Sequence, residues 1–219
     1  MSSTTIKKFL QWLRLPGLNQ ERYWQQRAAE YGRRAVLNLV HAEEEFDQVT
    51  EHQWKELIPY LQPLLIGDEK LILDFGCGPG RFTAELARLI GGKAIGVDPI
   101  SHFIELAPKH SFVEYRAMRD GEIPVSSESV DVVWICLVLG GVVKDRLLIK
   151  TLAEINRVLR KDGLLFLVEN TTVKSNGGHW VFRSTDEYID MFPFMKLVHL
   201  HDYFDLGERI SIMAGRKFR

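Results

Sequence analysis

The spacing of hydrophobic residues changes near residue 70 and divides the chain into two parts. In the first part apolar residues recur at helical spacing, beginning with Ile6, Phe9, Leu10 and Leu13. The motif PG at 16–17 is expected to end this first helix. The same period predicts a second helix and a third, over residues 19–40 and 49–61.

From residue 70 onwards short apolar runs alternate with amphipathic segments. We expect strands over 70–75, 93–98, 111–116, 129–139 and 163–170, and helices over 80–90, 101–107 and 144–160. Strands that are apolar at consecutive positions and joined through helices are typical of a parallel sheet buried on both faces. The pattern therefore predicts a doubly wound α/β fold.

The end of the chain follows a different pattern. After a short helix over 184–192, two alternating runs over 194–204 and 208–217 flank the turn sequence DLG, which predicts an antiparallel hairpin. We find no repeat and no linker composition. We therefore expect residues 1–66 to form a helical cap on the same domain as a core over 67–219.

Composition and charge exclude several classes of protein. Hydrophobic residues make up 46% and charged residues 26% of the 219, which is ordinary for a globular protein. The formal net charge of -1 argues against binding nucleic acid by bulk charge. Cys77 and Cys136 form no metal-type pair, so no metal site is predicted. No apolar run is long enough for a transmembrane helix, and we expect a cytoplasmic protein.

The stretch LILDFGCGPGRFTAEL, residues 71–86, carries the strongest chemical signal. A glycine turn between a strand and a helix is a general anion site. A nucleoside triphosphate loop needs G-K-[ST] at the helix start, where this chain has Arg81 and Phe82, and a dinucleotide fingerprint needs G-x-G-x-x-G instead of G-x-G-x-G. Asp74, under the turn, would repel a pyrophosphate. S-adenosylmethionine fits better, since its ammonium can meet Asp74 while its carboxylate uses the exposed N–H groups of the turn.

Asp98, at the end of the next expected strand, lies eighteen residues beyond Gly80. An acidic side chain at this place can accept hydrogen bonds from both ribose hydroxyls. Because both dinucleotides and S-adenosylmethionine contain a ribose, Asp98 supports a nucleoside without choosing between them.

The order and spacing of LILDFGCGPGRFTAELA, AIGVD, EIPVSSESVDVVWICLVL and LAEINRVLRKDGLLFLVEN resemble the seven-stranded, Rossmann-like class I S-adenosylmethionine-dependent methyltransferases. The resemblance covers residues 70–170, and it is nearest to the small-molecule branch that includes the type 11 enzymes. It implies a cofactor site built from Asp74, Gly76, Cys77, Gly78, Gly80, Asp98, Pro99, Ala117, Met118 and Leu137. The first five would surround the methionine end, Asp98 would hold the ribose, Pro99, Ala117 and Met118 would lie beside the adenine, and Leu137 would pass close to the sulfonium.

The methyl acceptor is less well defined by the sequence. The end of the fourth strand lacks the N/D-P-P-Y segment of amino-methylating enzymes and has Gly140 and Gly141 where many small-molecule relatives have a histidine. Candidate bases are His179 and Glu169, near the end of the fifth strand, although in-line placement of the acceptor can supply most of the catalysis without a base. The alternatives are a surface histidine and a carboxylate that caps a neighbouring segment.

Aromatic residues of the cap, Tyr23, Trp24 and Tyr31, could line the acceptor pocket as a lid or could simply pack on the sheet. The function predicted is in-line methyl transfer from S-adenosylmethionine to a small-molecule acceptor. The alternatives are a protein side-chain methyltransferase, a non-catalytic S-adenosylmethionine-binding regulatory subunit and a nucleotide-dependent oxidoreductase. The atom methylated and the oligomeric state stay open.

Overall fold

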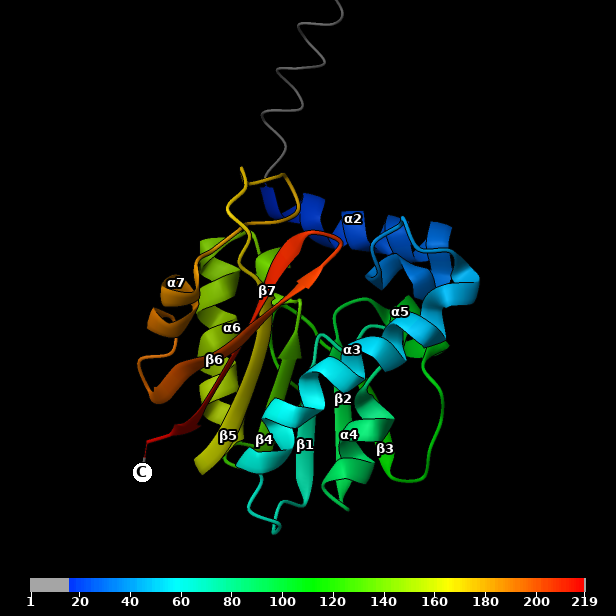
Figure 1. The fold of residues 1–219 in the computed structure, drawn as a ribbon. Coiled ribbons are helices and arrows are strands. Elements are labelled where there is room, and N and C mark those ends of the chain that lie inside the picture. Colours follow the sequence, from blue (N-terminus) through cyan, green and yellow to red (C-terminus); the bar gives the residue numbers. More distant parts are fainter. Residues whose placement is uncertain (1–15, 219) are drawn as a thin grey trace, which may run out of the picture.

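The computed structural model describes the backbone of residues 16–218 and the side chains of residues 20–218. The helix expected around Ile6 to Leu13 lies outside the described residues. Figure 1 shows helices on both faces of one sheet. The helices are α2 (Pro16–Tyr31), α3 (Phe46–Leu61), α4 (Thr83–Leu89), α5 (Ser101–Leu106), α6 (Asp145–Val158) and α7 (Thr185–Asp190), with 3-10 turns η1 (Gly32–Val36), η2 (Glu43–Glu45), η3 (Gln62–Leu64) and η4 (Leu139–Gly141).

The seven strands form one mixed sheet with the order β3-β2-β1-β4-β5-β7-β6. Their bounds are β1 (Leu71–Phe75), β2 (Lys93–Asp98), β3 (Val113–Ala117), β4 (Val130–Cys136), β5 (Leu159–Asn170), β6 (Met195–Asp205) and β7 (Glu208–Lys217). Strands β1 to β5 pair in parallel, and β7 pairs antiparallel with both β5 and β6. The predicted doubly wound sheet and its terminal hairpin are confirmed.

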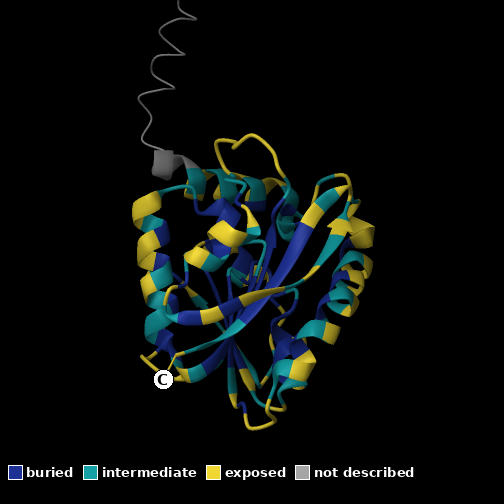
Figure 2. Cartoon of the chain, turned by 60° about the vertical axis from the view of Figure 1, so that its left-hand side comes forward, coloured by how far each residue is buried: buried dark blue, intermediate teal, exposed yellow. Residues whose placement is uncertain are grey.

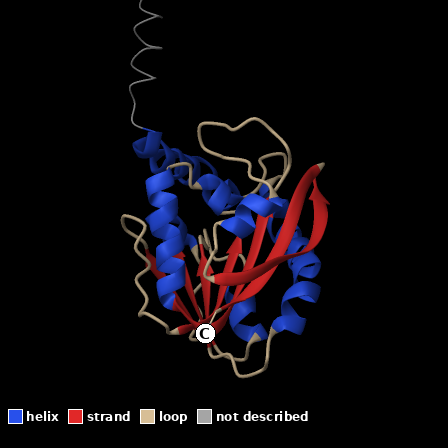
Figure 3. Cartoon of the chain, turned by 90° about the vertical axis from the view of Figure 1, so that its left-hand side faces the viewer, coloured by secondary structure: helices blue, strands red, loops and turns tan. Residues whose placement is uncertain are grey.

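The central strands are buried on both faces, as their continuous apolar sequences predict. On one face Leu73 and Val133 belong to a core closed by α6 and α7, and on the other Ile72 and Trp134 pack with α3 and α4. Figure 3 shows these helices on both sides of the strands, and in Figure 2 the strand interiors are dark blue. Because a strand points successive side chains to opposite faces, both sets of apolar positions are needed for two helical layers.

The cap differs from the sequence prediction at two boundaries. Pro16 begins α2, whereas PG was expected to end a helix; proline suits a helix start because its missing N–H has no acceptor there. The second helix ends at Tyr31, not near Val40, because Gly32 takes a φ of +54° and the chain continues as η1. Further on, Leu57 and Leu61 of α3 pack into the same core as β1 and β4.

Candidate active site

The glycine loop between β1 and α4 has the backbone conformation that its glycines permit. Gly76, Gly78 and Gly80 have φ values of +71°, +53° and +78°. A Cβ at Gly76 would lie 2.5 Å from Val138, one at Gly78 would lie 2.9 Å from Val36, and one at Gly80 would overlap the Tyr115 hydroxyl. The loop is therefore enclosed by η1 of the cap, β3 and the segment after β4, and a side chain at these positions has no room.

The backbone N–H groups of this loop are engaged within the protein. Those of Gly76 and Cys77 both donate to the Val97 carbonyl, at 2.8 and 3.1 Å, and that of Gly80 donates to the Cys77 carbonyl at 3.0 Å. The Gly78 N–H donates to Asp98 Oδ2 at 3.0 Å. The remaining residue of the loop, Pro79, has no N–H. The N–H groups that were expected to meet a ligand carboxylate thus already have acceptors.

Asp74, at the end of β1, is buried below the loop and has one side-chain hydrogen-bond partner among the described residues. The Thr83 hydroxyl donates to its Oδ2 at 2.6 Å. Burial raises the pKa of Asp74 to about 7, and the negative charge of Asp98 adds to the shift while the Thr83 hydrogen bond opposes it. A cation placed beside Asp74 would favour its charged form.

Asp98, at the end of β2, lies next to the glycine loop as the motif predicts. Its two oxygens accept from the backbone N–H groups of Gly78 and Ile100, at 3.0 and 2.8 Å. Burial raises the pKa of Asp98 to about 6, and both hydrogen bonds oppose that shift. The bonds fix the carboxylate at the tip of the strand, and each oxygen retains a lone pair for a further donor.

The three residues expected beside the adenine lie around the same strand ends. Pro99 and Ala117 are exposed, Asp98 pairs with Ala117 in the β2–β3 register, and the N–H of buried Met118 donates to the Asp98 carbonyl at 2.9 Å. Ile100, next to Pro99, is buried against Ala28 and Ala35 of the cap. The structure thus brings the predicted nucleoside residues together under α2 and η1.

The segment after β4 lies between the glycine loop and the segment that follows β5, because Val138 packs against Gly76 and Trp180 packs against Gly140. Leu137 takes a φ of +57°, and η4 follows it. Glu169 is fully buried beneath this segment and accepts from the N–H groups of Val138, Leu139 and Gly140 at 2.9, 2.6 and 3.3 Å, and from the Tyr188 hydroxyl at 3.3 Å. Burial raises the pKa of Glu169 to about 7 against these hydrogen bonds.

A cavity of about 270 Å³ lies between the cap, the segment after β4 and the segment that follows β5. Tyr23, Trp24, Leu137, His179 and Trp180 are among its lining residues. The rings of Tyr23 and His179 stack with centroids 4.3 Å apart and planes 19° apart. The structure therefore brings together four of the predicted residues that lie far apart in the sequence.

Tyr31 is the predicted lid residue that does not line this cavity. It packs with Ile100 and Val36 in the apolar cluster beside the nucleoside side of the site. The physical reason is the helical period, because Tyr31 lies two turns beyond Tyr23 on the same face of α2 and so contacts a different part of the core.

Several residues of the site were not recognised from the sequence. Trp180 covers Gly140 so closely that a Cβ there would overlap its indole, so the glycine at 140 leaves room for the tryptophan. Gln20 bonds the cap to η4 by donating to the Gly141 carbonyl and accepting from the Val143 N–H at 3.2 Å. Arg183 donates to the Leu139 carbonyl at 3.1 Å. The only sequence signal for these contacts was the tryptophan next to His179.

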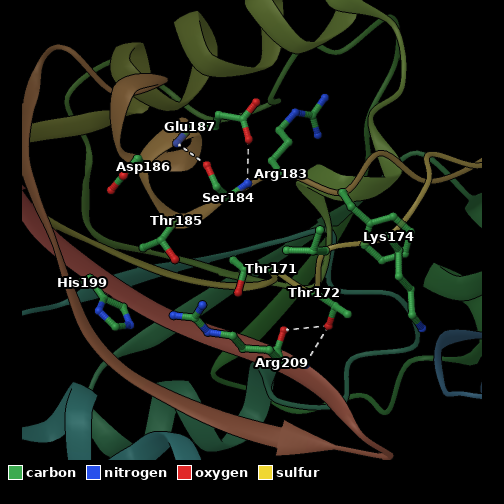
Figure 4. Close-up of a pocket in the computed structure, with 12 residues that line it drawn as sticks. Thr171, Thr172, Lys174, Arg183, Ser184, Thr185, Asp186, Glu187, His199 and Arg209 are labelled. Atoms are coloured by element: carbon green, nitrogen blue, oxygen red, sulfur yellow. Dashed lines mark hydrogen bonds between the residues drawn. The ribbon is translucent and has the colours of Figure 1, made fainter.

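A second hollow lies outside this site, between α7, the segment after β5 and β7 (Figure 4). Its cations have partners: Lys174 pairs with Glu208, and Arg209 donates to Asp202 at 2.6 Å. Asp202 also contacts His199 Nε2 at 2.8 Å. Arg183, which also lines the hollow, has no ion pair among the described residues and donates to the carbonyls of Leu139 and Val142.

Comparison with known proteins agrees with this geometry. Residues 73–167 match a family model described as a methyltransferase domain. An uncharacterised methyltransferase-like protein of Schizosaccharomyces pombe is 32% identical over 108 residues, which span 49% of this chain and 41% of that protein. The chain thus aligns with less than half of the length of this curated relative.

Solved structures share the fold. The YcgJ protein of Bacillus subtilis superposes with a TM-score of 0.64 at 14% identity, covering 76% of this chain and 99% of that one. A putative methyltransferase of Haloferax volcanii, solved with the Trm112 methyltransferase activator, gives 0.64 at 16% identity, covering 80% and 94%. A SAM-dependent methyltransferase of Aquifex aeolicus gives 0.60 at 16%, covering 80% and 98%.

No helix within residues 16–218 is both long and apolar enough to cross a membrane. The family match lies on the segment that carries the glycine loop and Asp98, and the fold is similar to that of the solved methyltransferases. Residues 73–167 thus resemble a methyltransferase domain, and the chain has the fold of solved methyltransferases.

Proposed function

We propose that the protein transfers the methyl group of S-adenosylmethionine to a small-molecule acceptor held in the cavity between Tyr23, Leu137 and His179. The observation that carries the proposal is that this cavity, with a volume of about 270 Å³, opens beside Leu137 at the end of β4. Such a volume suits a small acceptor or a single side chain.

The donor occupies the other half of the site. Asp98 accepts from the ribose hydroxyls, and Asp74 faces the ammonium at the methionine end. Gly76, Cys77, Gly78 and Gly80 give the close backbone approach, while Pro99, Ala117 and Met118 border the adenine. S-adenosylmethionine held by these residues would supply an electrophilic methyl group, and Leu137 would lie between the donor and the cavity in which the protein positions the acceptor.

The two candidate bases are given different roles. His179 is exposed, lines the cavity and stacks on Tyr23, so it is the residue able to take a proton from a bound acceptor. Glu169 is a positioning residue, because both its oxygens accept from the backbone of the segment after β4. Tyr23 and Trp24 form the wall of the pocket, and Tyr31 holds the cap on the nucleoside side.

The test uses S-adenosylmethionine labelled in its methyl group, incubated with the protein and a fractionated cell extract. Label in an acid-soluble product that is separated by chromatography from unreacted S-adenosylmethionine supports a small-molecule acceptor, and label in precipitated protein supports the side-chain alternative. An Asp98→Ala variant serves as the control, since it should lose binding of S-adenosylhomocysteine in calorimetry and transfer no label. Cofactor binding without transfer to any fraction would favour the non-catalytic regulatory subunit.

A further inference from the structure

The cavity between the cap and the segment that follows β5 is walled by aromatic rings that keep part of their surface exposed. Five of its lining residues carry such a ring: Tyr23, Trp24, His179, Trp180 and Phe182. His179 is exposed and the other four are partly exposed. Large aromatic side chains of the core, such as Trp134, Tyr188 and Phe166, are by contrast fully buried. Ring surface is therefore available to a ligand at this cavity.

The planes of these rings are fixed by contacts between two distant segments. Tyr23 stacks on His179 at 4.3 Å, and it meets Trp24 edge-on, with centroids 5.3 Å apart and planes 79° apart. The Trp180 indole lies over Gly140, where a Cβ would overlap it. A flat ligand would thus meet ring surfaces that are already ordered, and ordering such side chains on binding would otherwise weaken its affinity.

The arginines of the cavity donate to neutral groups of the protein. Each nitrogen of the Arg27 guanidinium donates within the cap, two of them to the carbonyls of Ala35 and Leu37 at 2.6 and 2.8 Å. Arg81 donates to the Gln53 side-chain oxygen at 2.6 Å. Neither arginine has an ion pair among residues 20–218. These bonds tie the cap and α3 to the rest of the site.

The acids of the cavity are held by buried amides. Gln53 donates to Asp205 at 3.2 Å, and Asn170 donates to Glu208, which also pairs with Lys174. Among the described lining residues there are two arginines and two acids, so the lining has no net formal charge with its histidines neutral. A charged ligand would lose its hydration there without meeting a net opposite charge.

We propose that the acceptor held in this cavity is an uncharged molecule with a planar aromatic ring, bound by stacking on the rings of α2 and of the segment after β5. The charge balance favours a neutral ligand, and the partly exposed ring surfaces favour a flat one. The cavity volume of about 270 Å³ has room for a small ring system. This inference rests on the proposed function and narrows the class of its acceptor.

The experiment compares two alcohols by ligand-observed NMR titration: 2-naphthol and decahydro-2-naphthol, which keeps the carbon skeleton and the hydroxyl but is not flat. Wild-type protein should bind 2-naphthol about tenfold more tightly, as expected for two aromatic contacts. Burial of apolar surface alone predicts no such preference, because the saturated compound is at least as apolar. The anion 2-naphthoate should bind no more tightly than 2-naphthol.

Variants of single rings test where the preference comes from. Trp24→Leu should reduce the ratio of the two affinities to below about threefold, because the aliphatic side chain offers no ring to stack on. Phe112→Leu is the matched control: this ring is also partly exposed, but it lies beside His110 ahead of β3 and does not line the cavity. It should leave the ratio unchanged. Should Trp24→Leu fail to fold, Phe182→Leu decides by the same measurement.

Two binding results overturn the inference. Equal affinity of the wild type for the flat and the saturated alcohol would show that the rings do not recognise a planar ligand. Tighter binding of 2-naphthoate would show that the arginines select an anionic acceptor. Neither result requires methyl transfer, so a labelled small-molecule product obtained alongside them would leave the proposed function standing.

The labelled product itself gives a second test. It should absorb near-ultraviolet light, as aromatic compounds do, and a labelled product without this absorption would overturn the inference while supporting the proposed function. A clear preference for 2-naphthol in a protein that transfers no label to any fraction would overturn the proposed function, and the acceptor role of the bound ring with it.

Discussion

The donor half and the acceptor half of the site are built in opposite ways. Most of the proposed donor half comes from one continuous segment, β1 to β2, in which Asp74, the glycine loop and Asp98 are held by bonds among neighbours such as that from Gly78 to Asp98. The acceptor half joins residues that are more than a hundred positions apart, such as Tyr23 with His179 and Gln20 with Gly141. A sequence motif can therefore predict the donor half, whereas no short motif can predict the acceptor half.

The largest effect is expected from a substitution in the glycine loop of the proposed donor half. Gly80→Val should lower the affinity for S-adenosylhomocysteine at least about a hundredfold, because the new side chain overlaps Tyr115 and displaces the loop. Gly91→Val is the matched control: Gly91 also has a positive φ, of +59°, but a Cβ there meets no atom within 4 Å. Calorimetry on both variants separates the overlap from the backbone strain that they share. Equal affinities in the two variants would contradict the close packing of the loop.

The next largest effect is expected on stability, from a substitution of Glu169, which supports the segment between the donor half and the acceptor half. Glu169→Gln should lower the free energy of unfolding by about 1–3 kcal/mol. The NH2 group of glutamine replaces one carboxylate oxygen and cannot accept a hydrogen bond from the backbone N–H groups of Leu139 or Gly140. Denaturant titration measures the change. Glu187→Gln is the control, since Glu187 is exposed and bonds only at the start of α7. A Glu169→Gln protein of unchanged stability that no longer transfers methyl groups would make Glu169 a base and not a positioning residue.

A smaller effect is expected from pH, through Asp74. With a pKa of about 7 it is protonated in the free protein below that pH, and a proton must leave before the ligand ammonium gains a charged partner. The affinity for S-adenosylhomocysteine should fall about tenfold between pH 8 and pH 6. Asp74→Asn should bind weakly at both values and show less of this dependence, with Asp98, whose pKa is about 6, contributing the remainder.

The same titration has the opposite sign for the stability of the free protein. A folded-state pKa above the ordinary value means that folding favours the protonated acid, so Asp74 lowers the free energy of unfolding as the pH rises from about 4 to 7. Thermal unfolding at pH 5.5 and 7.5 measures this effect. A slope that is identical in Asp74→Asn would assign it to other groups, of which Glu169 is the first candidate.

The smallest effect probes the acceptor half alone. His179→Ala should change the affinity for S-adenosylhomocysteine less than about twofold, because His179 contacts the cap and the cavity and not the glycine loop. If His179 takes the proton, the His179→Ala variant should transfer methyl groups to the acceptor found in the labelling experiment more slowly than the wild type. This difference between variant and wild type should be larger at low pH than at high pH. A loss of cofactor binding in this variant would show that the two halves are coupled.

Much of the fold and the donor half followed from the order of residues. The run of apolar strands and the turn DLG predicted the sheet and its hairpin, and the glycine motif predicted that the loop and Asp98 lie together, because parallel strands bring their carboxyl ends to one edge. The boundaries of the cap did not follow, since the start at Pro16 and the end at Tyr31 depend on how single residues are used at helix ends. Trp180 was missed because its contact with Gly140 spans forty residues.

The amino-acid sequence by itself determined the class of fold, the donor loop and the acid at each strand end, since these depend on local backbone conformation and period. The tertiary structure alone decided that the N–H groups of the loop are engaged and that Glu169 supports the segment after β4. Whether a donor or a charge has a partner depends on which distant groups folding brings within about 3 Å, and a linear pattern of residue types carries no such distance.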